Sequence, residues 1–136
     1  MTSPLSEVEV ITLFVDDIAL TRDFYATAFA RPVIYEDDVS FVLQFENLMV
    51  NFLQISAADD LVEPKTASTA TTSAQILLTI RVENADAACA TLRDCGVELL
   101  NGPIDRPWGR RTAAFADPSG HVWEIAQVIA NQEGAS

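Results

Sequence analysis

The 136-residue chain contains the same pattern of secondary structure twice, and this repeat limits its possible folds more than any other feature. The segment VITLFVDD at 10–17 aligns with LLTIRVEN at 77–84, and LMVN at 48–51 aligns with HVWE at 121–124. Each copy predicts a strand, a helix and then three strands. The larger offset at the second pair of segments predicts a longer loop at 102–109. Two such halves predict an α+β fold with helices on one face of each sheet.

The stretch between the two copies has a different composition. It is rich in Ala, Thr, Ser and Asp, and residues 66–73 show no apolar periodicity, which predicts a flexible linker at 57–74. We therefore expect a single domain over 1–136, made of a first module at about 8–56 and a second module at about 75–130. Within the second module, Asn101-Gly102-Pro103 predicts a turn between two strands.

Charge, hydropathy and residue counts exclude several classes of protein. The chain has 8 basic against 20 acidic residues, a net charge of −12, which argues against a nucleic-acid partner. No apolar run is long enough to predict a membrane span. Cys89 and Cys95 lie six apart on one predicted helix, so we expect no disulfide between them and a cytoplasmic location. A single histidine, His121, excludes a zinc site of Cys and His ligands.

Strand alternation predicts which side chains turn away from the helices. The first and last strands of each copy place an apolar set with a few polar groups on that face, which is typical of a ligand cavity. The ligand-binding residues predicted in this way are Val10, Thr12, Phe14, Met49, Asn51, Leu77, Thr79, Arg81, Val122 and Glu124.

Three residues of the predicted longer loop are further candidates for the ligand site. Trp108 is followed closely by Arg110 and Arg111, and an aromatic ring beside two cations could clamp a planar or anionic group. The alternative is a surface loop on which Trp108 covers apolar area.

One stretch of the second copy carries a resemblance to a known family. The sequence FADPSGHVWE at 115–124, together with TLFVDD at 12–17 and RDFY at 22–25, resembles the vicinal oxygen chelate (VOC) superfamily. This group includes glyoxalase I, extradiol dioxygenases, fosfomycin-resistance enzymes and bleomycin-resistance binding proteins. The resemblance covers nearly the whole chain. It implies two βαβββ modules whose sheets form an incomplete barrel around a cavity, usually completed in a homodimer. The alternative is a pair of ferredoxin-like units.

The resemblance also implies where a divalent metal would be held. Transferred to this sequence, the four ligand positions are Val10, Asn51, Leu77 and Glu124, of which only Glu124 is a competent ligand. Two aliphatic side chains donate no electron pair, so we expect no metal and no other cofactor. The alternative is a divalent metal held through Glu124 and a non-standard ligand set.

These observations lead to two functional hypotheses. The first is a metal-free binding protein of the bleomycin-resistance kind, a homodimer that sequesters an aromatic or cationic small molecule. The second is a glyoxalase- or dioxygenase-like enzyme in which Glu124 is catalytic. Glu124 can equally form a salt bridge to Arg81. His121, after the predicted turn at 117–120, is more typical of a structural histidine than of a base.

Overall fold

The computed structural model describes residues 4–69, 74 and 76–129, and the chain divides into two compact units, Met1–Thr69 and Ala70–Ser136. Residues 70–73, near the end of the predicted linker, and the chain end from 130 onwards lie outside the described residues.

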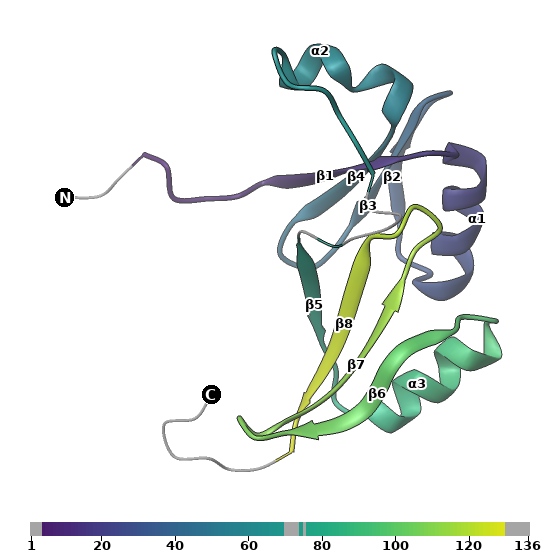
Figure 1. The fold of residues 1–136 in the computed structure, drawn as a ribbon, viewed down its shortest axis with the longest axis vertical. Helices are drawn as coiled ribbons and strands as arrows, with labels where there is room; N and C mark the ends of the chain where they lie inside the picture. Colours follow the sequence, from purple (N-terminus) through teal and green to yellow (C-terminus); the bar gives the residue numbers. More distant parts are fainter. Residues whose placement is uncertain (1–3, 70–73, 75, 130–136) are drawn as a thin grey trace. The chain divides into compact units, whose positions relative to one another are not determined.

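Unit 1 is a four-stranded sheet with one long helix. Its strands lie in the order β1-β4-β3-β2, with β1 parallel to β4 and the other neighbours antiparallel (Figure 1). Its elements are β1 (Val10–Val15), α1 (Ile18–Ala28), β2 (Val33–Glu36), β3 (Ser40–Gln44) and β4 (Met49–Gln54). Two short helices follow β4, a 3-10 turn η1 (Ile55–Ala57) and α2 (Asp59–Val62), and α2 lies within the segment predicted as a linker at 57–74.

Unit 2 repeats this topology with its own residues. Its strand order is β5-β8-β7-β6, and β5 is parallel to β8. Its elements are β5 (Leu77–Arg81), α3 (Ala85–Asp94), β6 (Leu99–Arg106), β7 (Arg110–Ala116) and β8 (Val122–Val128). The α+β class and the duplicated βαβββ unit are therefore confirmed, and the ferredoxin-like alternative is wrong because three consecutive strands follow each helix. Neither sheet closes into a barrel.

The two long helices begin at equivalent capping residues. In α1 the Asp17 side chain accepts a hydrogen bond from the Leu20 amide at 3.0 Å, and in α3 the Asn84 side chain accepts one from the Ala87 amide at 2.9 Å. Each cap satisfies an amide that has no partner within its own helix.

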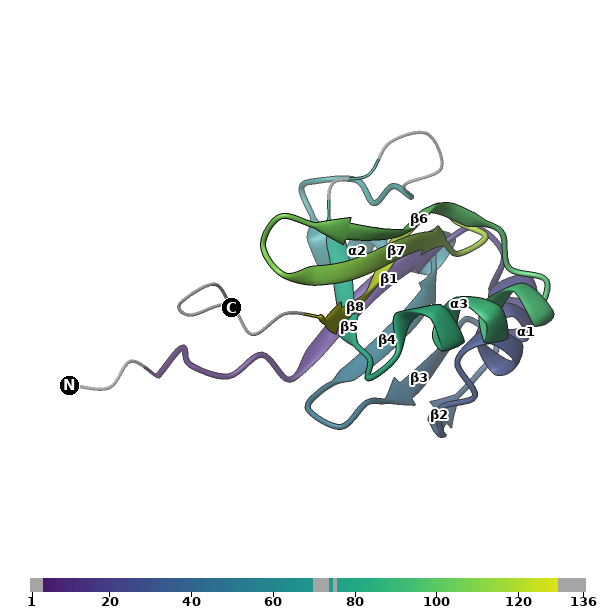
Figure 2. The same ribbon diagram turned by 90° about the horizontal axis from the view of Figure 1, so that it is seen from below.

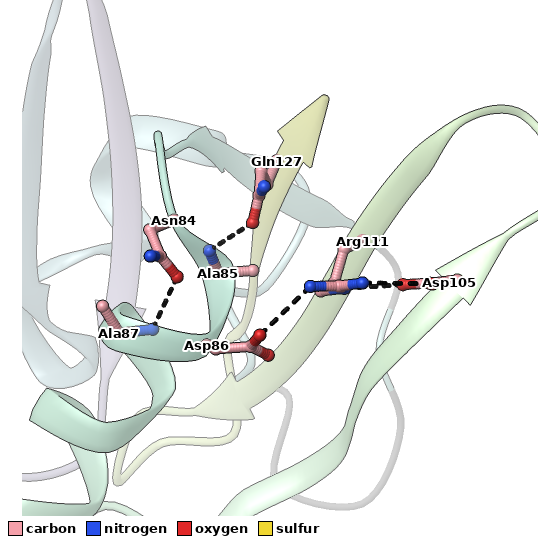
Figure 3. Close-up of polar contacts among 7 residues, drawn as sticks. All are labelled: Asn84, Ala85, Asp86, Ala87, Asp105, Arg111 and Gln127. Atoms are coloured by element: carbon pink, nitrogen blue, oxygen red, sulfur yellow. Dashed lines mark hydrogen bonds and ion pairs between the residues drawn. The ribbon is translucent and has the colours of Figure 1, made fainter. Parts of the chain in front are cut away.

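A glutamine at the end of the last strand of each unit holds the start of the helix. Gln54 Oε1 accepts from the Ile18 amide at 2.9 Å, and Gln127 Oε1 accepts from the Ala85 amide at 2.7 Å. Figure 3 shows the contact of Gln127 beside the Asn84 cap. The same residue type thus ties helix to sheet in both units.

The cores of the units lie between helix and sheet and differ in their residues. In unit 1 the ring of Tyr25 lies 4.2 Å from that of Phe52, which stacks on Phe41 at 4.6 Å between ring centroids. In unit 2 the register pair Ala113–Ile125 takes the place of Phe41–Phe52, and the aromatic side chains of Phe115 and Trp123 are buried as well. The buried apolar residues of unit 2 are Ala85, Cys89, Leu92, Val97, Ala113, Ala114, Phe115, Trp123, Ile125 and Ala126.

The predicted turn at 101–103 and the predicted loop at 102–109 are both wrong. β6 runs through Gly102 and Pro103 as an edge strand with shifts in register against β7, and the chain turns only at 107–109 (Figure 2). Gly102 has φ +89 and lies so close to β7 that an added Cβ would be 2.4 Å from the Thr112 carbonyl oxygen. An edge strand with an irregular register tolerates both residues, because Pro103 needs no ladder donor there. The extra residues of the second copy therefore form a longer hairpin.

Two further sequence predictions concern thiols and membranes. No disulfide joins Cys89 to Cys95, as the sequence predicts. In the part of the chain that the structure describes, no helix is long and apolar enough to cross a membrane.

Candidate functional site

Each sheet has a face turned away from its helix, which we call the open face. In β1 the side chains of Leu13 and Val15 are buried while Val10 is 40% exposed, and in β5 Leu77 is 52% exposed. Along β4 and β8 the same alternation leaves Asn51 and Glu124 half-buried. The other open-face residues predicted from the sequence are Thr12, Phe14, Met49, Thr79, Arg81 and Val122, which are half-buried or exposed.

A polar pair lies at the same place on both open faces. In unit 1 Thr12 and Asn51 are register partners, and Asn51 Nδ2 donates to Thr12 Oγ1 at 3.4 Å. In unit 2 Thr79 and Glu124 are register partners, and Thr79 Oγ1 donates to Glu124 Oε1 at 2.9 Å. The units therefore present an amide and a carboxylate at equivalent positions.

The salt bridge considered between Glu124 and Arg81 is not formed. Arg81 is the register partner of Ala126 rather than of Glu124. Within 76–129 no ion pair joins the two side chains, and the contact of the Glu124 carboxylate is with the Thr79 hydroxyl. The partner of the Glu124 carboxylate within 76–129 is thus a hydroxyl and not a cation.

The four positions implied for a divalent metal do not fit one. Val10 and Leu77 are aliphatic, so the set offers one amide and one carboxylate, and that carboxylate already accepts a hydrogen bond from Thr79. Nowhere among residues 4–69, 74 and 76–129 do three His, Cys, Asp or Glu side chains gather in a way that could hold a metal ion. Hard divalent cations need several oxygen donors around them.

The structure separates the three residues predicted to act together at 108–111. Trp108 lies in the turn between β6 and β7 and is 55% exposed, while Arg110 and Arg111 belong to β7 rather than to a loop. Because they are neighbours in a strand, their side chains point to opposite faces. Only Arg110 is therefore on the open face.

Arg111 is held on the helix side of the sheet by two carboxylates. Its Nε donates to Asp105 at 2.6 Å and its Nη1 to Asp86 at 3.1 Å, as Figure 3 shows. The hydrogen bond from Arg111 holds the pKa of the Asp105 carboxyl below its usual range, and Asp105 in turn raises the pKa of Arg111. Arg111 thus joins β7 to β6 and to α3, on the face opposite to that of Arg110.

A third arginine, Arg106, lies on the open face of unit 2 and was not predicted from the sequence. Arg106 is the register partner of Arg110, and its Nε donates to Thr112 Oγ1 at 2.9 Å. The predicted loop at 102–109 concealed it, because strand alternation was not applied to those residues. With the turn at 107–109, Arg106 and Arg110 are register partners and so lie on the same face of the sheet.

The Asp117–Gly120 segment forms the predicted turn before β8. The Asp117 carboxylate accepts from the Ser119 and His121 amides at 2.9 Å each, and Gly120 has φ +89. The side chain of His121 is buried after this turn. The turn fixes the start of β8, two residues before Glu124.

A comparison with protein families identifies the family to which the duplicated fold belongs. The model of the Glyoxalase/Bleomycin resistance protein/Dioxygenase superfamily matches residues 7–125. The chain belongs to this superfamily. The VOC resemblance of the sequence is confirmed by this match, which spans both units and all eight strands up to the middle of β8.

One curated protein is similar to this VOC chain in sequence, and several solved structures are similar to it in fold. The uncharacterized protein YraH of Bacillus subtilis (strain 168) is 28% identical over 124 residues, covering 88% of this chain and 96% of YraH. A glyoxalase-related enzyme from Fulvimarina pelagi superposes with a TM-score of 0.78 at 24% identity, covering 90% of this chain and 88% of that one. Lactoylglutathione lyase from Agrobacterium tumefaciens gives 0.73 at 14% identity, covering 92% and 96%. These structural similarities establish the fold.

Proposed function

We propose that this VOC-family chain is a metal-free small-molecule binding protein that sequesters an aromatic or cationic ligand on the open faces of its sheets. The observation that carries the proposal is the set Val10, Asn51, Leu77 and Glu124 at the positions where the family resemblance implies metal ligands. A single carboxylate and two aliphatic side chains are suited to hold an organic ligand rather than a catalytic ion.

The chemistry of the ligand follows from the residues of the open faces. Apolar side chains such as Val10, Phe14 and Leu77 supply surface against which an aromatic group gains affinity by burial. Glu124 is half-buried, with a hydroxyl rather than a cation as its partner, so a cationic group would offset its desolvation. The net charge of −12 would speed the approach of such a ligand at low salt.

A binding assay with a matched pair of probes tests this proposal. Wild type, Glu124→Gln and the control Glu98→Gln, an exposed carboxylate between α3 and β6, are compared by thermal shift and calorimetry. The probes are ethidium as a planar aromatic cation, bleomycin as a glycopeptide, and coumarin as a neutral aromatic compound. We expect Glu124→Gln to weaken ethidium about tenfold at low salt, less at high salt, and to leave coumarin unchanged, in line with the loss of one partly buried charge interaction. Equal responses of all three proteins to every probe would contradict the proposal.

Metal content and turnover separate this proposal from the enzyme alternative. We expect that a chelator does not change the midpoint of thermal denaturation of the purified protein. Near-stoichiometric zinc, nickel, manganese or iron that is removed by a chelator with loss of stability would favour a metal-dependent enzyme. Turnover of glutathione adducts, abolished in Glu124→Gln, would lead to the same conclusion.

We also propose a homodimer in the cytoplasm. Large apolar side chains are exposed on the edge strands, among them Ile34 on β2 and Leu100 on β6, and the absence of a disulfide between Cys89 and Cys95 suits a reducing compartment. Sedimentation is expected to give a dimer at micromolar concentration, and a species of 14.8 kDa would contradict it.

A further inference from the structure

The β6–β7 hairpin of unit 2 concentrates positive charge in a strongly acidic chain. Of the eight basic residues, three lie on this hairpin: Arg106, Arg110 and Arg111. Arg106 and Arg110 face each other directly as register partners on the two strands. Like charges at such a position repel each other, so the pair is unfavourable unless something negative lies between them.

These two arginines share the open face with Glu124. Arg106 donates to the hydroxyl of Thr112, which follows Arg110 by two residues and so lies on the same face of β7. Thr112 is the register partner of Ala126, whose other partner is Arg81. On the open face of unit 2, Thr112 and Ala126 therefore lie side by side. Arg106 contacts Thr112, and Arg81 lies next to Ala126 on the other side.

No carboxylate neutralises this set. Within residues 76–129 the structure pairs neither Arg106 nor Arg110 with an acidic side chain, whereas Arg111, the next residue in β7, contacts both Asp86 and Asp105. The contact of Arg106 with Thr112 uses its Nε only, so this contact does not occupy the two Nη groups. The hairpin thus has a neutralised helix side and a positively charged open side.

We infer that Arg106 and Arg110 form an anion subsite that binds a carboxylate or phosphate group of a small molecule. Guanidinium groups match both oxyanions with paired hydrogen bonds, and the contact to Thr112 holds one of them in place before binding. The inference rests on the proposed binding function and narrows its ligand. A molecule that uses both Glu124 and this subsite carries a cationic or aromatic part and an anionic part. The charge of −12 opposes long polyanions, which favours a small ligand over a nucleic acid.

Arginine side-chain NMR on the full chain tests the subsite directly. Inorganic phosphate and, separately, acetate are titrated at constant ionic strength while the Nε–H signals are followed. We expect saturable shifts at Arg106 and Arg110 and none at Arg111. The tighter of the two anions identifies which group the subsite prefers. Shifts that do not saturate, or that are the same at Arg111, would overturn the inference.

Substitutions provide a second measurement with a matched control. Arg110→Gln removes a side chain that has no ion pair within 76–129, so the fold is expected to be retained, and phosphate is expected to bind at least fivefold more weakly. Arg106→Gln is expected to do the same, and Arg93→Gln, on the exposed side of α3, to bind like wild type. Unchanged phosphate affinity in a folded Arg110→Gln protein would overturn the inference.

The variant Glu124→Gln distinguishes failure of the subsite from failure of the proposed function. Loss of this negative charge is expected to leave phosphate binding equal to or stronger than in wild type. If phosphate fails to bind while ethidium still depends on Glu124, the subsite is wrong and the proposed function stands. If phosphate binds through Arg106 and Arg110 while no probe depends on Glu124, the subsite stands and the proposed cationic ligand is wrong.

Discussion

Units 1 and 2 have the same topology and the same helix anchors, but not the same interior or the same open face. Asp17 corresponds to Asn84 and Gln54 to Gln127, and each pair makes the same hydrogen bond to a helix amide. These contacts join helix to sheet and satisfy amides that would otherwise lack a partner. The two units thus share the residues that hold helix to sheet and differ in the residues between and outside them.

The interiors diverge in the size of their side chains. Phe52 of unit 1 lies among aromatic rings, whereas its counterpart in unit 2, Ile125, pairs with Ala113 across the strands.

The two units also differ in glycine content and in backbone φ angles. All five glycines of the chain lie in the second unit, and the positive φ described in the first is that of Ala30, at 52°.

The open faces diverge in charge. Asn51 of unit 1 corresponds to Glu124 of unit 2, and Phe14 corresponds to Arg81. The first face is therefore neutral at these positions, and the second carries both signs of charge. The charged groups that would contact a ligand, Glu124 and the pair Arg106 and Arg110, therefore all belong to unit 2.

The largest expected effect tests the aromatic interior of unit 1. Phe52→Ala should cost about 4 kcal/mol of unfolding free energy, because it leaves a cavity and removes two ring contacts. Ile125→Ala at the corresponding place should cost about 3 kcal/mol. Urea denaturation followed by circular dichroism measures both, with the exposed Leu20→Ala as control. An equal or larger cost for Ile125→Ala would break the contrast between the two interiors.

The next effect tests the close approach of β6 to β7 in unit 2. Gly102→Ala should cost about 3 kcal/mol, because its Cβ would overlap the Thr112 carbonyl oxygen at a positive φ. Gly96→Ala, at φ +85 with no atom within 4 Å, is the matched control and should cost about 1 kcal/mol. Both tryptophans lie in unit 2, so tryptophan fluorescence during denaturation follows the unit concerned. Similar costs for the two variants would show that crowding in β6 is not important.

A smaller effect tests the shared anchors. Gln54→Ala should cost about 2 kcal/mol and Gln127→Ala about 1 kcal/mol, since each leaves a helix amide without its partner. Gln54 costs more because its Nε2 also donates to the Asp16 carbonyl. Thermal denaturation of the two variants measures the difference. Gln44→Ala is unsuitable as a control, because the Gln44 side chain also donates to a backbone carbonyl. A larger loss for Gln127→Ala would reverse the order predicted here.

The smallest effect concerns two exposed carboxylates with lowered pKa values. The Tyr35 hydroxyl lowers the pKa of Asp37 in unit 1, and Arg111 lowers that of Asp105 in unit 2. Both groups therefore stabilise the fold above their unfolded pKa of about 3.9, and the contribution is lost as the pH falls through the lower folded value. Added salt should raise the pKa of Asp105 toward its usual range and leave that of Asp37 almost unchanged, because a cation lowers the pKa of Asp105 and a neutral hydroxyl is the largest cause at Asp37.

Carbon NMR of the two carboxyl groups at low and high salt checks this prediction. Arg111→Gln should bring the pKa of Asp105 closer to that of an ordinary aspartate and leave Asp37 unaffected. Equal responses of the two carboxylates to salt would contradict the assignment of different causes.

Much of the fold could be predicted from the sequence because its signals are local. The alternation of Ile11, Leu13 and Val15 with their neighbours, and the capping residue before each helix, depend only on residues close in the chain. They were sufficient to predict the duplicated unit and most of the open-face residues. The prediction was wrong at 101–109, where Gly102 and Pro103 have the local signature of a turn but pair with β7 in an irregular edge strand.

Which polar side chains meet depends on how distant segments of the chain pair in the fold. Register between β5 and β8 places Thr79 rather than Arg81 beside Glu124, and the late turn at 107–109 places Arg106 opposite Arg110. It also gives Arg111 two acidic partners, Asp105 and Asp86, the latter from α3. The sequence by itself determined the faces of the strands, since side-chain direction alternates from one residue to the next. It could not determine the contacts across them, because register depends on pairing between segments far apart in the chain.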